Sequence, residues 1–320
     1  MIADRDPRQG ASQQATRIRG LIEDDTDDIV ELYARAATVD PRIGPIHGSD
    51  WERFVRQPQN HCGRDFRVAL SEGRLVGLAE SSLRDQAERR VRFFKLIVDP
   101  AMRRRGIGSA LLAELLTLDQ SNDALSLQTL AARDWPAGLA FLGALGFGHI
   151  ESEISMRCST LTAPPAAQAE GFSLVRVAAP ADHAVDIARI HNAAFASDAA
   201  FRHTTPAEMA RLIEHDAVWI ATDTSGAVGF CRLELENDLI WLESIAVDPA
   251  CQNRGLGSAL AFRALSAAGL ERDRPAGLNV SSSNPAALSV YERLGFVTVR
   301  EMYRFSARHS DVGDAMALRR

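Results

Sequence analysis

Two stretches of the chain are nearly the same: residues 98–111 read VDPAMRRRGIGSAL, and residues 247–260 read VDPACQNRGLGSAL. Gly255 lies 149 positions after Gly106. The same offset relates DWPAGLAFLGALGF at 134–147 to SNPAALSVYERLGF at 283–296. A repeat of this length matches one domain and is too long for a solenoid unit, so the sequence predicts a duplicated domain.

Composition along the chain sets the expected boundaries of the two copies. The chain has 320 residues, enough for two domains of ordinary size. The linker is expected in STLTAPPAAQAEG, which shows neither helical nor strand periodicity. The predicted division is a flexible N-terminus at 1–15, a first half at 16–158, the linker at 159–171, a second half at 172–307 and a loosely held tail at 308–320.

Charge and hydropathy narrow the class of protein. Hydrophobic residues make up 46% of the chain, the formal charge is −6 and the pI is about 5.8. An acidic chain of this kind argues against a nucleic-acid-binding protein, although RRR at 103–105 is a local basic spot. No apolar run reaches the length of a membrane span, and the first residues lack a signal-peptide pattern. We therefore expect a cytoplasmic monomer or homodimer that contacts neither nucleic acid nor membrane.

The four cysteines show no metal-binding spacing. None of Cys62, Cys158, Cys231 and Cys251 belongs to a C-x-x-C pair. We expect reduced thiols, most of them buried, and no metal site.

Periodicity predicts an α/β fold in which each half has a mixed, mostly antiparallel central sheet flanked by helices. In the second half the predicted strands are 172–177, 217–223, 227–236, 239–247 and 276–282, with a final strand pair at 296–300 and 302–307. The predicted helices are 181–195, 205–215, 255–269 and 285–295.

The repeated element reads as a strand, a glycine-rich loop and a helix. The first amides of a helix have no internal acceptor, and the helix dipole adds positive charge, so this loop is suited to phosphate. A Walker loop is excluded because the chain has no GK pair, and a dinucleotide loop lacks its third glycine, since Leu111 and Leu260 occupy that place. The remaining candidate is [QR]-x-x-G-x-[GA], which fits RRRGIG at 103–108 and QNRGLG at 252–257.

This loop, followed about 30 residues later by SNPAALSVYERLGF, resembles the acetyl-CoA signature of the GNAT acyltransferase superfamily. The resemblance covers almost the whole chain, in two copies. It implies acetyl-CoA as cofactor, held at its pyrophosphate by the loop amides, and a sheet that parts to admit the pantetheine arm. The implied cofactor residues are Ile245, Ala246, Val247, Gln252, Asn253, Arg254, Gly255, Leu256, Gly257, Ser258, Asn284 and Tyr291. The second candidate cofactor site comprises Val98, Arg103, Arg104, Arg105, Gly106, Ile107, Gly108 and Ser109.

Two side chains of the second half are candidates for acid–base catalysis of acetyl transfer to an amine. Tyr291 matches the family's tyrosine acid near the coenzyme sulfur, although packing is the alternative. Glu243 lies inside a buried strand, where strand alternation places it on one face with Trp241, Ile245 and Val247. A carboxylate there is expected to act as base, unless it points to solvent or pairs with an arginine.

The first half lacks all three polar candidates. At the 149 offset Tyr291 corresponds to Leu142, Asn284 to Trp135 and Glu243 to Phe94. We therefore expect catalysis in the second half only, with a first half that binds coenzyme or supports its partner. Asn284 is expected to cap its helix whether or not it also contacts coenzyme.

The acceptor is expected to contact the segment HNAAFASDAAFRHTTPAEM at 191–209, with Phe201, Arg202 and His203 as candidate substrate residues. Their mixed character suits the primary amine of a small polar molecule. The tandem layout and HNAAF resemble the mycothiol synthase group of the family, which implies a glucosaminyl-inositol-cysteine amine. Aminoglycoside- and peptide-acetylating members share the layout, and a non-catalytic acyl-CoA sensor remains the alternative from another class, with a dinucleotide oxidoreductase as a weaker one.

Overall fold

The computed structural model describes residues 16–40, 43–56, 60–86, 89–119, 125–164, 170–196, 203–236, 238–270 and 274–318. The expected flexible N-terminus lies outside these ranges. None of the described helices has the length and apolar character that crossing a lipid bilayer requires.

The first half alternates strands and helices as the pattern predicts. Its strands are β1 Arg17–Gly20, β2 Arg67–Ser71, β3 Arg74–Gln86, β4 Arg89–Val98, β5 Ser126–Ala132 and β6 Gly148–Cys158. Its helices are α1 Thr26–Val39, α2 Gly48–Val55, α3 Cys62–Asp65, α4 Ile107–Leu116 and α5 Pro136–Gly143. Short 3-10 turns are η1 Glu23–Asp25, η2 Pro100–Met102 and η3 Thr117–Asp119.

The second half repeats this order. Its strands are β7 Ser173–Arg176, β8 Ala217–Asp223, β9 Gly226–Leu235, β10 Ile240–Val247, β11 Ala276–Ser281 and β12 Val297–Arg308. Its helices are α6 Ala184–Phe195, α7 Pro206–Leu212, α8 Leu256–Ala267, α9 Pro285–Arg293 and the C-terminal α10 His309–Ala317. The 3-10 turns η5 Pro180–His183 and η6 Pro249–Cys251 precede α6 and α8.

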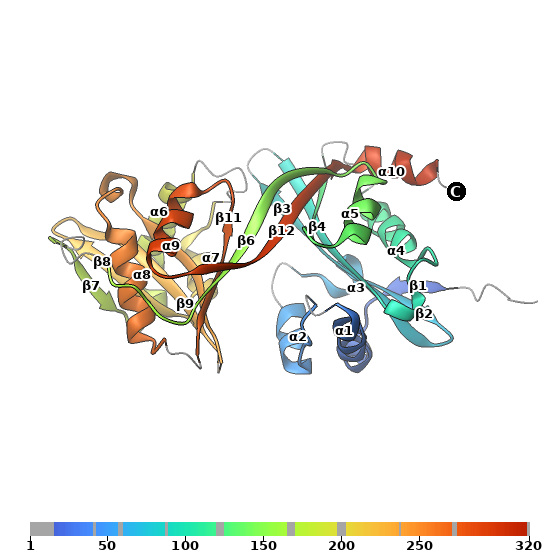
Figure 1. Ribbon diagram of the computed structural model, residues 1–320, viewed down its shortest axis with the longest axis horizontal. Helices are drawn as coiled ribbons and strands as arrows, with labels where there is room; N and C mark the ends of the chain where they lie inside the picture. The colour runs from blue at the N-terminus through green and yellow to red at the C-terminus, as the bar shows by residue number, and fades with distance from the viewer. Residues whose placement is uncertain are drawn as a thin grey trace, which may run out of the picture.

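Helices cover both faces of the sheet in each half, which confirms the predicted fold class (Figure 1). In the first half, α1 and α2 bury one apolar cluster against the sheet, and α4, α5 and α10 bury another. In the second half, α6 and α7 cover one face while α8 and α9 cover the other. Burial of these apolar faces is the main stabilising term for such layers.

The two halves share one continuous sheet. The 12 strands found in the described residues follow the order β1-β2-β3-β4-β5-β12-β6-β11-β10-β9-β8-β7. The last strand of the second half, β12, therefore pairs with β5 of the first half, and β6 pairs with β11 of the second. Figure 1 shows β6 and β12 running side by side between the halves.

The exchange of strands follows the duplication. Met302 pairs with Glu153, and these two positions are themselves 149 residues apart. The antiparallel β6–β12 ladder thus has a local pseudo-twofold axis at this pair. The boundaries between the halves remain a prediction. In the continuous sheet, however, the strands of each half pair with a strand of the other half.

Residues 296–300 and 302–307 do not form the predicted pair of strands. They form the single strand β12, because Glu301 pairs with Ile154 in the ladder and no turn residue separates the two segments. A register shift between Thr298 and Arg300 makes the β6–β12 ladder irregular without ending the strand.

The C-terminal residues expected to be a loosely held tail form α10. Val312 is fully buried in the apolar cluster of the first half, with Met316 against the same cluster. His309 donates its amide to the Leu125 carbonyl at 3.0 Å. Helix α10 therefore packs against the first half (Figure 1).

Removal of residues 297–320 should open the first half although residues 16–158 are intact. β5 would lose its whole antiparallel partner, from Met302 opposite Ala132 to Arg308 opposite Ser126. We expect the β5 amides to lose protection in native-state hydrogen exchange. Deletion of 309–320 alone should leave them protected, and equal protection in the two truncated chains would refute the structural role of the exchange.

Candidate active site

The parallel strands β10 and β11 part after two residue pairs. Ile240 pairs with Ala276 and Trp241 with Gly277, and the pairing described for these strands stops there. β10 continues to Val247, held on its other edge by β9. The β11-facing edge of β10 beyond Trp241 therefore keeps backbone groups available for a ligand.

A β-bulge interrupts β10 immediately after this point. Its register with β9 shifts between Leu242, which pairs with Leu233, and Ser244, which pairs with Arg232. Glu243 is the extra residue. A bulge re-aims the side chains and main-chain groups around it, and such bulges are frequent next to active sites.

The bulge makes the predicted alternation around Glu243 wrong. Ile245 and Val247 contact the same apolar cluster as Leu242, beneath α8. Ala246 contacts the opposite cluster, beneath α6 and α7. The extra residue reverses the side-chain parity of the strand, so Glu243 does not share a continuous face with the apolar positions that follow it.

Glu243 lies at the protein surface among other acidic groups. Loss of hydration is the main cause that raises the pKa of its carboxyl. The positive charge of Arg232 lowers this pKa. The negative charges of three neighbours raise it again: Glu234, Asp216 and Glu236. Arg232 is held by Asp216 at 2.7 Å, which limits its pairing with Glu243. The result is a carboxylate with increased affinity for a proton, as a general base requires.

Tyr291 is buried in the core between α9 and the sheet. The residue is 6% exposed, and its ring centroid lies 5.8 Å from that of Phe296. Burial, and secondarily the Cys231 thiol, raise the pKa of the phenol. No hydrogen bond of the hydroxyl to another described residue affects this pKa. The raised pKa keeps the phenol protonated, so the hydroxyl can act as a donor.

The loop between β10 and α8 has the backbone geometry of an anion site. Asn253 and Gly255 adopt left-handed conformations, with φ of 61° and 78°. Within the described structure, the amides of residues 253–258 donate to no acceptor of the chain. A row of unpaired amides at the start of a helix fits a pyrophosphate group.

Gln252 closes this loop rather than reaching outward. Its Nε2 donates to the Val247 carbonyl at 3.0 Å. Arg103 does the same in the first half, where Nε donates to the Val98 carbonyl at 3.2 Å. The glutamine-or-arginine preference of the motif therefore has a structural cause, since either side chain ties the loop to the end of its strand.

Two other predicted cofactor residues have defined positions. Asn284 caps α9, accepting from the Ala287 amide at 3.0 Å, as expected. Arg254 extends over the Phe172 ring, 4.6 Å from its centroid. Its cation thus lies beside the loop, supported by an aromatic face.

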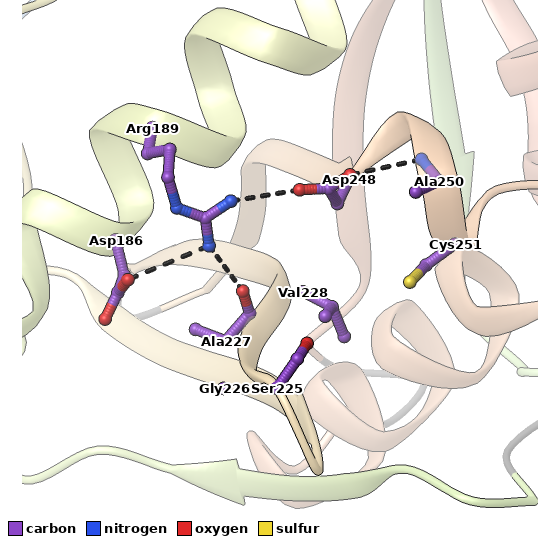
Figure 2. Close-up of a pocket in the computed structure, with 9 residues that line it drawn as sticks. All are labelled: Asp186, Arg189, Ser225, Gly226, Ala227, Val228, Asp248, Ala250 and Cys251. Carbon is purple, nitrogen blue, oxygen red and sulfur yellow. Dashed lines mark hydrogen bonds and ion pairs between the residues drawn. The ribbon is translucent and has the colours of Figure 1, made fainter.

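The sequence did not indicate a role for Arg189, which binds the aspartate at the start of the loop between β10 and α8. Arg189 of α6 contacts Asp248 at 2.9 Å and the Ala227 carbonyl, and Asp248 accepts from the Ala250 amide at 3.1 Å. Figure 2 shows these contacts in a pocket at the strand ends. The same arrangement joins Arg35 to Asp99 in the first half. The two arginines are not 149 positions apart, so the repeat gave no signal for them.

The first half keeps the loop but not the bulge. Arg104 and Gly106 have φ of 62° and 80°, and the amides of residues 104–109 donate to no acceptor in the described chain. β4 and β5 part after three pairs, the last at Phe93. The β3–β4 ladder, however, runs from Gln86 opposite Arg89 to Gly77 opposite Val98 without a register shift.

The corresponding side chains of the first half fill space. Phe94 and Leu142 are buried in one apolar cluster. The Trp135 ring covers Gly138 so closely that a Cβ there would meet it at 2.1 Å. The first half thus has the phosphate-binding backbone without acid–base groups at these positions.

The predicted acceptor segment is only partly described. Phe201 and Arg202 lie outside the described residues. His203 Nε2 lies 3.2 Å from Asn192 Nδ2. The Asn192 side chain also donates to the Thr204 carbonyl and accepts from the Thr204 amide. Burial and Arg232 lower the pKa of His191, whose ring centroid lies 4.9 Å from that of Phe195 with the two rings tilted.

Comparisons with known proteins agree with this geometry. Residues 27–147 match the acetyltransferase (GNAT) family, and residues 214–298 match the acetyltransferase (GNAT) domain. The mycothiol acetyltransferase of Nocardia farcinica is 31% identical over 294 residues, 86% of this chain and 92% of that protein. That of Mycolicibacterium vanbaalenii is 28% identical over 292 residues, again 86% and 92%.

Solved structures share the tandem fold. A tandem GNAT protein from the clavulanic acid biosynthesis pathway has a TM-score of 0.72 at 21% identity, covering 92% of this chain and 99% of that one. A GCN5-related N-acetyltransferase from Sphaerobacter thermophilus has a TM-score of 0.74 at 16% identity, covering 92% and 96%. The chain therefore belongs to the GNAT family: it is an N-acetyltransferase with two GNAT units, and acetyl-CoA is its acyl donor.

Proposed function

We propose that the second half transfers the acetyl group from acetyl-CoA directly to the primary amine of a small polar acceptor. The observation that carries this assignment is the β10 bulge, with Glu243 at its apex and unpaired amides at the end of the same strand. The first half has the amides without the bulge. In this proposal the donor lies along the free edge of β10, with its pyrophosphate on the amides of 253–258.

The acceptor amine needs to lose a proton before it attacks, since an alkylamine is protonated at neutral pH. Glu243 takes this proton, directly or through a water. Glu234 and Glu236 add negative charge around it, which attracts an ammonium ion to the same place. The neutral amine then attacks the thioester carbonyl, whose oxygen accepts from a main-chain amide at the bulge.

Tyr291 donates to the departing sulfur. Its raised pKa keeps the phenol protonated, so it supplies a hydrogen bond as negative charge develops on the thiolate. A covalent acetyl-cysteine route is disfavoured, because burial raises the pKa of the neighbouring Cys231 to about 12. Amine, donor and protein are therefore expected to form one ternary complex.

For the acceptor we propose the desacetyl precursor of mycothiol, because the relatives that match most of the chain are mycothiol acetyltransferases. The acidic surround of Glu243 suits its amine. The test is release of free thiol from acetyl-CoA with glucosaminyl-inositol-cysteine beside aminoglycosides and peptide amines. Faster thiol release with a peptide amine would show that the proposed acceptor is wrong. If no amine caused thiol release from acetyl-CoA, the proposed function itself would be refuted.

Replacement of Tyr291 by phenylalanine should lower kcat by at least about tenfold with little change in the Kd of acetyl-CoA. The ring stays in its packed position, and only the hydroxyl is lost. Steady-state rates and calorimetric titration measure the two effects. Tyr303→Phe in β12 is the matched control and should leave kcat unchanged; equal rates for both variants would remove Tyr291 from the mechanism.

Glu243→Gln should reduce kcat/KM by about 10²- to 10⁴-fold and abolish the acidic limb of its pH profile. In the native protein that limb should lie above about 4.3, the ordinary pKa of a glutamic acid, because the pKa of Glu243 is raised. A raised carboxyl pKa stabilises the fold at low pH, and this contribution is lost as pH rises through it. The variant should therefore be no less stable than the native protein at pH 7, whereas an acidic limb that persists would exclude Glu243 as the base.

Gly255→Glu should abolish turnover and donor binding in the second half. The change places a side chain at a φ of 78° and a negative charge where the pyrophosphate is proposed to lie. Gly269→Glu is the control, with a φ of 76° and open space around it at the other end of α8. Turnover should survive there, and normal donor binding by Gly255→Glu would refute the loop assignment.

A further inference from the structure

We propose that the first half carries its own acetyl acceptor, the ε-amine of Lys95, and that acetyl-CoA held by residues 103–109 modifies it. The inference rests on the proposed retention of a donor site in that half. It assigns a self-acetylation site to a half whose catalytic positions are otherwise apolar.

Lys95 is the one lysine of the chain, which has 36 lysines and arginines together. Every other basic side chain of these two kinds is an arginine. Arginine stays protonated and is a poor nucleophile, whereas a lysine amine can lose its proton and attack a carbonyl. The one position at which the chain keeps lysine therefore has the chemistry of an acceptor.

The surroundings of Lys95 form a connected proton path. Its Nζ donates to the Tyr33 hydroxyl at 2.6 Å, and that hydroxyl donates to Glu80. Nζ also lies 3.7 Å from the Glu80 carboxylate and 4.6 Å from the centre of the Tyr33 ring. The Lys95 side chain is 48% exposed and that of Glu80 is 11% exposed, and Tyr33 is buried. An accessible amine thus faces a buried base through one phenol.

Lys95 is placed where a thioester would lie in the first half. β4 separates from β5 after Phe93, and Lys95 is the second residue beyond that point. The strand then ends at Val98, followed by the loop with unpaired amides. In the second half, Ser244 occupies the corresponding position at the 149 offset, immediately after Glu243. Where the second half has a hydroxyl side chain, the first half has an amine.

Aromatic side chains pack around Tyr33, the residue that accepts the hydrogen bond from Lys95. Trp51 lies 6.5 Å from Tyr33 and 5.9 Å from Phe66 between ring centroids. Phe54 stacks on Phe66 at 5.9 Å. These rings belong to the apolar cluster between α1, α2 and the sheet. Tyr33, the hydrogen-bond partner of Lys95, is therefore fixed in place by this packing, while the Lys95 side chain is 48% exposed.

The transfer balances with groups that are present. The Lys95 ammonium gives one proton to the Tyr33 oxygen as Tyr33 gives its own to the Glu80 carboxylate, which ends protonated. The neutral amine attacks the thioester carbonyl, the N–C bond forms and the C–S bond breaks. The second amine proton ends on the coenzyme sulfur, leaving acetyl-lysine and free coenzyme A.

The test is incubation of the full chain with acetyl-CoA, followed by intact mass and peptide mapping. We expect a gain of one acetyl group at Lys95, absent in Lys95→Arg and slowed at least about tenfold in Glu80→Gln. Gly106→Glu, which blocks the first loop, should abolish the modification, whereas Gly146→Glu, with a similar φ of 82° and open surroundings, should retain it.

Two further measurements separate this inference from the proposed function. Gly255→Glu should lose turnover with added amines and still acetylate Lys95. An unmodified Lys95 in a native protein that turns over added amines would overturn the inference and leave the proposed function standing. Acetylation at the same rate in Gly106→Glu would also overturn it, because the reaction would then not depend on the first loop.

Discussion

The proposed active site depends on an interruption of main-chain pairing in the middle of a sheet. β10 loses its parallel partner after Trp241 and gains an extra residue at Glu243, while β9 holds its other edge in place. Free backbone groups, a displaced carboxylate and the amides of the following loop therefore lie along one strand. A regular ladder would satisfy these groups internally and leave nothing for a donor to bind.

Comparison of the two halves separates the loop amides from the strand bulge. Both halves keep the loop residues with left-handed conformations and a side chain, Arg103 or Gln252, that bonds the loop to the end of its strand. Both also keep an arginine that pairs with the aspartate before the loop, Asp99 or Asp248. Of the two equivalent described strands, β10 has a bulge and β4 does not. Exchange of β6 and β12 makes the pairing of strands in each half depend on the other half, so the first half has a structural role in the sheet of the second. Lys95 gives that copy a proposed chemistry of its own.

The sequence predicted the elements of the fold and the loop but not how the halves are joined. Strand and helix positions followed from periodicity, and the loop from glycines at a fixed offset. Strand exchange was not predictable, because β6 and β12 show the same pattern whichever edge they pair with. The tail was misjudged because α10 presents only a few apolar residues, such as Val312, whose partners come from the first half.

The candidate site shows the same limit at single residues. Glu243 was identified by residue type, but its direction was wrong because one inserted residue reverses the parity of the strand. Arg189 gave no signal, since helices before the repeated loop have drifted from the common offset. The distinctive place of Lys95 emerged only when Tyr33 and Glu80, far away in sequence, were found beside it.

The most direct test of the account is the structure of the protein with a non-hydrolysable acetyl-CoA analogue. We predict the pyrophosphate on the amides of residues 253–258 and the acetyl oxygen within hydrogen-bond distance of a main-chain amide at the β10 bulge, with Tyr291 beside the sulfur position. An analogue whose acetyl group lies away from the bulge, or beside β4 alone, would contradict the central claim.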